Sequence, residues 1–342
     1  VPSGHKGTRG SKVTVGLVDA DGRLLGPART LTSRAISAGG IAVAVAPTPA
    51  PQAAVAWIAR RGGPPEVDVA LLDPSGQSLR EAHLTGDSRD AGSVAIAWAH
   101  SGWIVAWVDD RDGNGDVYAA KLDRDLTRAG PDQQIRKAPG DASDLALTVG
   151  DDVAWIAWSD PRESPRDGVS DIFAATLRPE DAGRVGDEVR VLSTALHSRS
   201  PRLVTAPNGG ALVAWIEEAP AGIDAPGAAM VARLDRTAHV VGPPRALPLP
   251  PHDRATEVAL ERELDDLRAV VVDASLDGLS MAALRLADDG SSKTEASGLL
   301  DLDAPATFQV ALALAGSSMV FSDIGASPAD RRVRHAWVQW KR

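Results

Sequence analysis

One short apolar stretch returns along this chain at nearly constant spacing, and it limits the possible folds more than any other feature. Its clearest copy, residues 103–123, reads WIVAWVDDRDGNGDVYAAKLD. The two halves alternate with a period of two, which is typical of strands because successive side chains leave opposite faces of a pleated chain. The turn between them, DDRDGNGD, is rich in residues that accept unusual backbone angles. We therefore predict a β-hairpin that is repeated along the chain.

The repeats predict the fold class. The first hairpin strand returns as VAWIAR, VAWVDD, IAWSDP, VAWIEE, VVVDAS and MVFSDI. Steps of 50, 51, 57, 56 and 50 residues separate the equivalent positions, which are Trp57, Trp107, Trp158, Trp215, Val271 and Phe321. A short apolar strand precedes each copy, and the second hairpin strand and a further short strand follow it. Four antiparallel strands per repeat predict an all-β fold, a β-propeller built from four-stranded blades.

The two ends of the chain predict how the ring closes. Residues 13–19 and 28–32 read as strands of the third and fourth kind, and the last repeat supplies strands of the first and second kind, followed by RVRHAWVQW. These half-units complement each other, so we expect six blades, the last closed by both chain ends, with seven as the alternative. Whether RVRHAWVQW displaces the N-terminal strand or adds to that blade stays open. We expect one domain over residues 1–342, with residues 1–11 as a flexible N-terminal segment.

The repeated motif also resembles a known group of proteins. The pattern W-x-D-x-R, a Gly/Asn turn and D-[IV]-[YF]-A is similar to the repeats of bacterial exported β-propeller proteins, including the TolB-like and sialidase-like six-bladed groups. The best copies are Trp107, Asp109, Arg111, Asp116, Val117 and Tyr118, and then Trp158, Asp160, Arg162, Asp171, Ile172 and Phe173. The resemblance implies a propeller and a periplasmic, cell-surface or extracellular location in a bacterium. It implies no particular activity, and the S-x-D-x-G-x-T-W box of sialidase-type repeats is absent from the sequence.

Composition narrows the classes of partner and chemistry. The net charge of −10 argues against a nucleic-acid partner or an anionic membrane surface. No apolar run approaches the ~20 residues of a membrane-spanning helix, so no membrane span is expected. The absence of cysteine excludes disulfides and thiol catalysis.

The tryptophans divide into two groups. Those at the repeated position are expected in the core between blades, because a large apolar side chain at the same place in each unit is what blade packing needs. Five others lie outside that position, and we single out Trp103 and Trp340 as candidates for a binding surface. They support one functional alternative, a lectin.

Polar residues of the hairpin turns suggest two structural roles. The carboxylates that recur with arginines are expected to form ion pairs that fix the turns, since an active site is normally made once. In one turn Asp110, Asp112, Asn114 and Asp116 fit the first half of a calcium-binding loop. The glutamate expected at the twelfth position is missing, because Lys121 stands there.

No catalytic motif is present, and none of the seven histidines has metal-ligand spacing. The leading expectation is therefore a non-catalytic exported or cell-surface propeller, without catalytic residues or a required cofactor, that binds a protein or serves as an accessory subunit. The first alternative is a glycan-active hydrolase or lyase with a carboxylate site at the propeller mouth, and the second is a lectin. Two unrepeated carboxylates facing each other would favour the enzyme.

Overall fold

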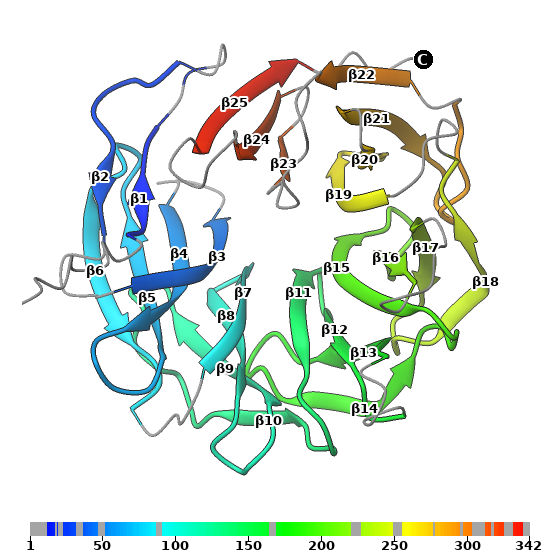
Figure 1. The fold of residues 1–342 in the computed structure, drawn as a ribbon. Coiled ribbons are helices and arrows are strands. Elements are labelled where there is room, and N and C mark those ends of the chain that lie inside the picture. Colours follow the sequence, from blue (N-terminus) through cyan, green and yellow to red (C-terminus); the bar gives the residue numbers. More distant parts are fainter. Residues whose placement is uncertain are drawn as a thin grey trace, which may run out of the picture.

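Six antiparallel sheets stand around a common centre in the computed structural model, and together they form a ring (Figure 1). The structure describes residues 12–17, 19, 23–31, 37–46, 52–86, 91–163, 169–219, 227–248, 255–275, 278–294, 297–302, 312–315, 318–324 and 331–337. All regular elements in these ranges are strands. No helix in the same ranges has the length and apolar character to cross a membrane.

Five of the sheets have four strands each and follow the chain in order, which confirms the predicted blades. Blade by blade, their strands are β3 (Ser37–Ala46), β4 (Gln52–Arg60), β5 (Glu66–Leu72) and β6 (Ser78–His83); β7 (Ala91–Ala99), β8 (Gly102–Asp109), β9 (Asp116–Asp123) and β10 (Gln133–Arg136); β11 (Ser143–Val149), β12 (Ala154–Asp160), β13 (Asp171–Leu177) and β14 (Arg184–Arg190); β15 (His197–Thr205), β16 (Ala211–Glu218), β17 (Ala228–Leu234) and β18 (Val240–Ala246); β19 (Ala255–Glu263), β20 (Asp266–Ser275), β21 (Gly278–Leu286) and β22 (Ser297–Leu302). We number these blades 1 to 5. The first strand of each lies nearest the centre and the fourth lies at the rim (Figure 1).

The sixth blade comes from the C-terminal part of the chain and has three strands. They are β23 (Leu312–Ala315), β24 (Ser318–Ile324) and β25 (Arg331–Trp337), and they pair in that order. The predicted number of six blades is thereby confirmed. The RVRHAWVQW segment supplies β25, the third strand of its blade.

The N-terminal strands β1 (Thr14–Val15) and β2 (Arg29–Thr30) pair with each other as a separate sheet. The neighbouring Val13 and Leu31 are buried against Trp57 of blade 1. Among the residues the structure describes, no ladder joins β1 or β2 to β25, so a last blade shared by both ends stays a prediction. The predicted flexible segment, residues 1–11, lies outside the described residues.

The repeated tryptophans are core residues, as predicted. Trp57, Trp107, Trp158 and Trp215 are each at most 1% exposed. Three of them also donate the indole N–H to a carboxylate two residues further along: Trp107 to Asp109 (3.2 Å), Trp158 to Asp160 (2.9 Å) and Trp215 to Glu217 (2.5 Å). The W-x-[DE] motif therefore satisfies a polar atom that packing between blades would otherwise leave buried without a partner.

The recurring arginines fix the turns, which was also predicted. Asp109 accepts hydrogen bonds from the backbone N–H of Arg111 (2.9 Å) and from its Nη2 (2.7 Å). Asp160 accepts the same bonds from Arg162, at 2.9 Å from the backbone and 2.5 Å from Nη2. Each guanidinium also lies over an aromatic ring of the next strand. These repeated carboxylates therefore have a structural role, which is to hold the turns in place.

Candidate functional site

The first strand of each blade borders the centre of the ring, beside the first strand of the next blade (Figure 1). In blades 1 to 5 the pairing of this strand with its neighbour is interrupted once, near its beginning, by a β-bulge. A bulge bends the strand and re-aims side chains. Counted back from the regular pairing with the second strand, the residues at the equivalent place in successive blades are Gly40, Ser93, Asp144, Ser200 and Glu257. The first four lie inside the bulge, whereas Glu257 directly follows it and pairs with Val272. We call this place the bulge position.

In blades 1, 3 and 4 the backbone at the bulge position is left-handed, which is costly for residues other than glycine. Asp144 and Ser200 have φ angles of 53° and 54°, close to the 54° of Gly40. Left-handed backbone of this kind is uncommon for residues with a side chain, and such strain gathers at functional sites. We infer that the side chains of Asp144 and Ser200 have a use that offsets the strain.

One use is structural, because side chains at the bulge position tie neighbouring blades together. The hydroxyl of Ser93 accepts a hydrogen bond from the backbone N–H of Leu145 in the next blade (2.9 Å). In the same way Oδ2 of Asp144 accepts one from the backbone N–H of Ser200 (3.0 Å). This contact uses one carboxylate oxygen of Asp144 and holds the group at the level of the bulge in blade 4.

Charged side chains of blades 3, 4 and 5 gather around these bulges. Arg202 Nη2 lies 3.2 Å from Glu257 Oε2, and Arg199 Nε lies 2.6 Å from Glu218 Oε2. Arg199 also donates to the backbone oxygen of Thr256 in blade 5 (3.3 Å). Together, Asp144, Arg199, Arg202, Glu218 and Glu257 form what we call the inner-strand cluster. All five side chains are only partly buried.

Glu257 is the carboxyl of this cluster whose protonation is most altered. Burial raises its pKa above the usual range, and Asp144 adds to that effect. The positive charges of Arg202 and Arg199 act in the opposite direction and do not cancel the shift. Its side chain is 19% exposed, so it stays reachable from solvent. A carboxyl that keeps its proton closer to neutral pH is suited to act as a general acid.

Geometry and charge together define the chemistry that the cluster allows. Asp144 and Glu257 hold the same place in blades 3 and 5, and the two arginines of β15 lie between them in the ring. One carboxyl is biased toward its protonated form while the other is held by a backbone donor. Glycosidic bonds are typically cleaved by two carboxyl groups, one of which is biased toward its protonated form by its surroundings.

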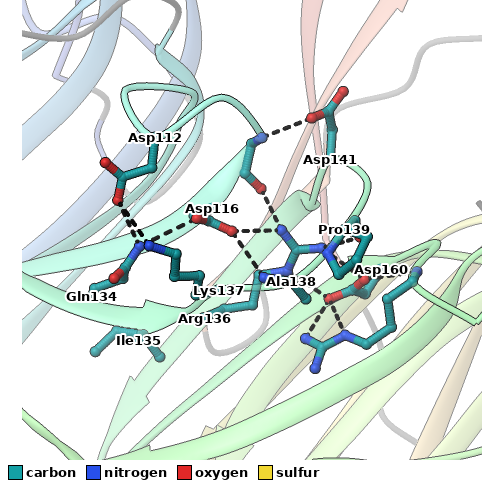
Figure 2. A network of polar contacts seen from close by, with 12 residues as sticks. Asp112, Asp116, Gln134, Ile135, Arg136, Lys137, Ala138, Pro139, Asp141 and Asp160 are labelled. Atoms are coloured by element: carbon teal, nitrogen blue, oxygen red, sulfur yellow. Dashed lines mark hydrogen bonds and ion pairs between the residues drawn. The ribbon is translucent and has the colours of Figure 1, made fainter.

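Two of the predicted calcium-loop residues, Asp112 and Asp116, interact with side chains outside the turn. Figure 2 shows Asp116 beside Arg136, with Nη1 at 2.9 Å from Oδ1, and Asp112 beside Gln134. Asp112 also accepts a hydrogen bond from the hydroxyl of Tyr118 (2.8 Å). Within the described ranges, no group of three or more histidine, aspartate or glutamate side chains is arranged to hold a metal ion. The structure therefore does not bring Asp110, Asp112, Asn114 and Asp116 together as a ligand set.

The predicted binding tryptophans do not form a surface site in the described part of the chain. Trp103 is 0% exposed, packs edge-to-face on Trp98 and donates its indole N–H to the backbone oxygen of Arg124 (3.3 Å). A side chain enclosed in this way has no free face on which a sugar can stack. Trp340 lies outside the described residues.

Sequence reasoning missed the inner-strand cluster, although a signal was present. In blades 1 to 5 the residue at the bulge position is followed by an apolar residue, and its identity changes from glycine to serine, aspartate, serine and glutamate. Without the bulges, Asp144 and Glu257 read as ordinary polar residues at strand starts. Their shared place becomes visible only when the strands are aligned on their pairing with the tryptophan strands.

Solved structures of similar fold provide the only comparison that gives matches. No protein-family model matches the chain, and no curated protein matches its sequence. An alpha-L-arabinanase of Penicillium chrysogenum, solved with arabinobiose, has a TM-score of 0.59 at 11% identity, covering 95% of this chain and 97% of that one. An alpha-L-arabinofuranosidase of Fusarium graminearum, solved with an iminosugar inhibitor, has a TM-score of 0.56 at 10% identity, covering 96% and 97%. A polysaccharide lyase acting on ulvan has a TM-score of 0.57 at 10% identity, covering 84% and 76%.

These comparisons support the propeller fold and correct the leading functional expectation. At such low identity they show the fold alone, and they show no TolB-like family. The similar structures are nevertheless enzymes that act on glycans. The expectation of a non-catalytic scaffold, without enzymatic activity and with a protein as its main partner, is therefore contradicted. The similar structures favour the alternative of a glycan-active enzyme.

Proposed function

We propose that this protein is a glycan-active enzyme, a hydrolase or a lyase, whose active site is the inner-strand cluster. The observation that carries the proposal is the placement of two unrepeated carboxyl groups, Asp144 and Glu257, at the bulge position of blades 3 and 5. A scaffold made of equivalent blades has no need for a carboxyl at this place in only two of them. Enzymes of similar fold that cleave glycans support the same assignment.

The residues of the cluster fit distinct roles. Glu257, with its raised pKa, would donate a proton to the leaving glycosidic oxygen. Asp144 would act as the base or the nucleophile on the reacting sugar. Arg202 contacts Glu257 directly and would orient it, while Arg199, held by Glu218, would bind sugar hydroxyl or carboxylate groups. We also propose a location outside the cytoplasm, where polymeric glycans are encountered.

The test is an activity panel with arabinan, arabinobiose and ulvan, followed by product analysis. We expect the wild-type protein to cleave at least one of these or a related polysaccharide. Glu257→Gln and Asp144→Asn should each lower kcat by at least about 100-fold, in line with removal of a general acid or base. Activity should also fall on the alkaline side as Glu257 loses its proton.

Glu263→Gln is the matched control, because Glu263 ends the same strand β19 and is exposed. It should leave activity unchanged. If the protein cleaves a glycan and the Glu257 and Asp144 variants fold normally and keep full activity, the assignment of the site is wrong. If a broad panel of glycans gives no cleavage and no binding, the enzyme proposal itself fails.

A further inference from the structure

One arginine interrupts a regular pattern on the first strands of the blades. In every blade, one residue of this strand pairs with the residue just before the repeated tryptophan or its substitute. In chain order these residues are Ala42, Ala95, Ala146, Arg202, Ala259 and Ala313. Blade 4 therefore carries an arginine where the other five blades carry alanine.

The packing of the blades explains the alanines. Ala42 packs on the apolar cluster that blades 1 and 2 share, and Ala95 belongs to the one that blades 2 and 3 share. Ala146 and Ala259 are 8% and 5% exposed. A small apolar side chain thus suits this place, where one blade faces the next. An arginine adds a charge that must be kept hydrated or paired, so packing gives no reason for Arg202.

The guanidinium of Arg202 has donors to spare. Nη2 lies 3.2 Å from Oε2 of Glu257, and Nη1 donates to the backbone oxygen of Pro201 (3.0 Å). A guanidinium has five N–H donors, and these two contacts with described residues use only part of them. The Arg202 side chain is 38% exposed. Part of its planar fork therefore remains open to solvent beside the centre of the ring.

The carboxyl groups of the inner-strand cluster neutralise Arg202 only in part. Glu218 pairs with Arg199 at 2.6 Å, and Asp144 is held by a backbone N–H of blade 4. Glu257 contacts Arg202 through a single oxygen, and its raised pKa opposes ionisation. Whenever Glu257 is protonated, as a general acid must be, Arg202 is left without a counter-charge. An anionic group of the ligand would supply that charge.

We propose that the glycan bound by the inner-strand cluster is acidic, and that Arg202 binds the carboxylate of a uronic acid unit. The inference rests on the proposed function, because it concerns the same site. The planar fork of an arginine matches the two oxygens of a carboxylate. A neutral glycan would leave the open donors of Arg202 without an anionic partner. A bound carboxylate would also favour the protonated form of the neighbouring Glu257.

Matched pairs of oligosaccharides test the proposal. The probes are trigalacturonic acid and triglucuronic acid, each beside the neutral trisaccharide made by reducing its carboxyl groups. Binding is measured by titration calorimetry with the Asp144→Asn protein, in which cleavage should be suppressed. In at least one pair the acidic member should bind about 10- to 100-fold more tightly, which is the affinity that a hydrogen bond to a charged group usually adds.

Arg202→Ala, made in the same background, assigns the preference to this side chain. The variant should fold like its parent, because alanine is the residue that five blades already have at this place. Its preference for the acidic member should fall at least about 10-fold. Arg262→Ala is the matched control, because Arg262 is a partly exposed arginine of β19 that contacts Thr205 at the far end of β15. It should keep the preference.

The outcomes separate this inference from the proposed activity. If Arg202 serves only to pair with Glu257, Arg202→Ala will weaken both members of a pair equally, and the proposal is overturned. It is also overturned if the neutral members bind as tightly as the acidic ones, or if no acidic member binds. Tighter binding of a sulfated neutral trisaccharide would overturn the assignment to a carboxylate. Binding of an acidic member that the wild-type protein does not cleave would support Arg202 as the anion site and count against the enzyme.

Discussion

Trp107 shows how a single side chain can hold two blades and a turn together. Its ring is fully buried in the apolar cluster between blades 1 and 2, stacked near Tyr118, and its indole N–H reaches Asp109, the residue that fixes the following turn. Removing the ring therefore leaves a cavity and also takes away one of the hydrogen bonds that hold the carboxylate of Asp109. The repeated motif is best understood as this combination of packing and capping.

We expect Trp107→Ala to lower the free energy of unfolding by ~3–5 kcal/mol, the usual cost of deleting a large buried aromatic side chain. Trp158→Ala and Trp215→Ala should behave alike, because both are 0% exposed and bond to a carboxylate in the same way. Denaturant unfolding is the measurement. Trp98→Ala, at a partly exposed position, serves as the milder control. A Trp107→Ala protein as stable as the wild type would remove that residue from the core.

At the scale of elements, each blade is held to the next by a polar junction as well as by apolar packing. Arg136 donates to two carboxylates of different blades and to the backbone oxygens of Gly115 and Pro139 (Figure 2). A fully buried guanidinium with this many acceptors fixes the angle between β10 and the next blade. Such a network is stable only when every member is present.

Arg136→Leu should therefore cost about 3–5 kcal/mol, since it leaves two buried carboxylates without their cation. The loss should be largest near pH 7 and should shrink in acid, because Arg136 helps to hold the pKa of Asp160 down and the buried carboxyl can take up a proton once that cation is removed. Melting curves between pH 7 and pH 4 give the measurement, and Arg128→Leu at the partly exposed rim provides a control. A loss that stays constant over this pH range would mean that only packing, and not charge, holds the junction.

The elements were predictable from the sequence to a larger extent than the site. The strands could be predicted from the alternation of apolar residues around the four repeated tryptophans. The blades could be predicted from the spacing of these tryptophans along the chain. Both patterns are visible in the sequence because they follow from local chain geometry. Arg136 could not be assigned from sequence, since its partners come from two blades and its counterpart in blade 3 is a leucine. Glu257 was missed for the related reason that a bulge shifts the alternation at the start of each first strand.

At the scale of the whole molecule, ring closure depends on the contact between the first and the last blade. On β3, Ile41, Val43 and Val45 are 55%, 60% and 61% exposed. On β7, the residues at the places of Ile41 and Val43 are Val94 and Ile96, which are 6% exposed each because blade 1 covers them. The side chains of Ile41, Val43 and Val45 thus form the apolar surface of β3 against which a last blade would pack to close the ring.

Deleting residues 331–342, which include β25, should destabilise the entire ring. The truncated last blade would expose an edge of β24 that β25 now pairs. We expect a lower melting temperature for the whole protein in calorimetry, with one broadened transition. Deletion of residues 1–11 is the control and should have little effect. If the chain shortened at its C-terminal end melts like the full chain, closure by the last blade is wrong.

The bulge position has an implication for how such a protein can acquire new specificities. Five blades each present one residue at the same register of the innermost strand, while the packing tryptophans stand on other strands. Exchanges at these positions therefore leave the packing tryptophans in place, but those at Ser93 and Asp144 also remove a hydrogen bond to the next blade. A library randomised at codons 93, 144, 200 and 257 would vary the polar groups at the ring centre while the tryptophan strands keep their sequence, so specificity and blade packing would be encoded on different strands.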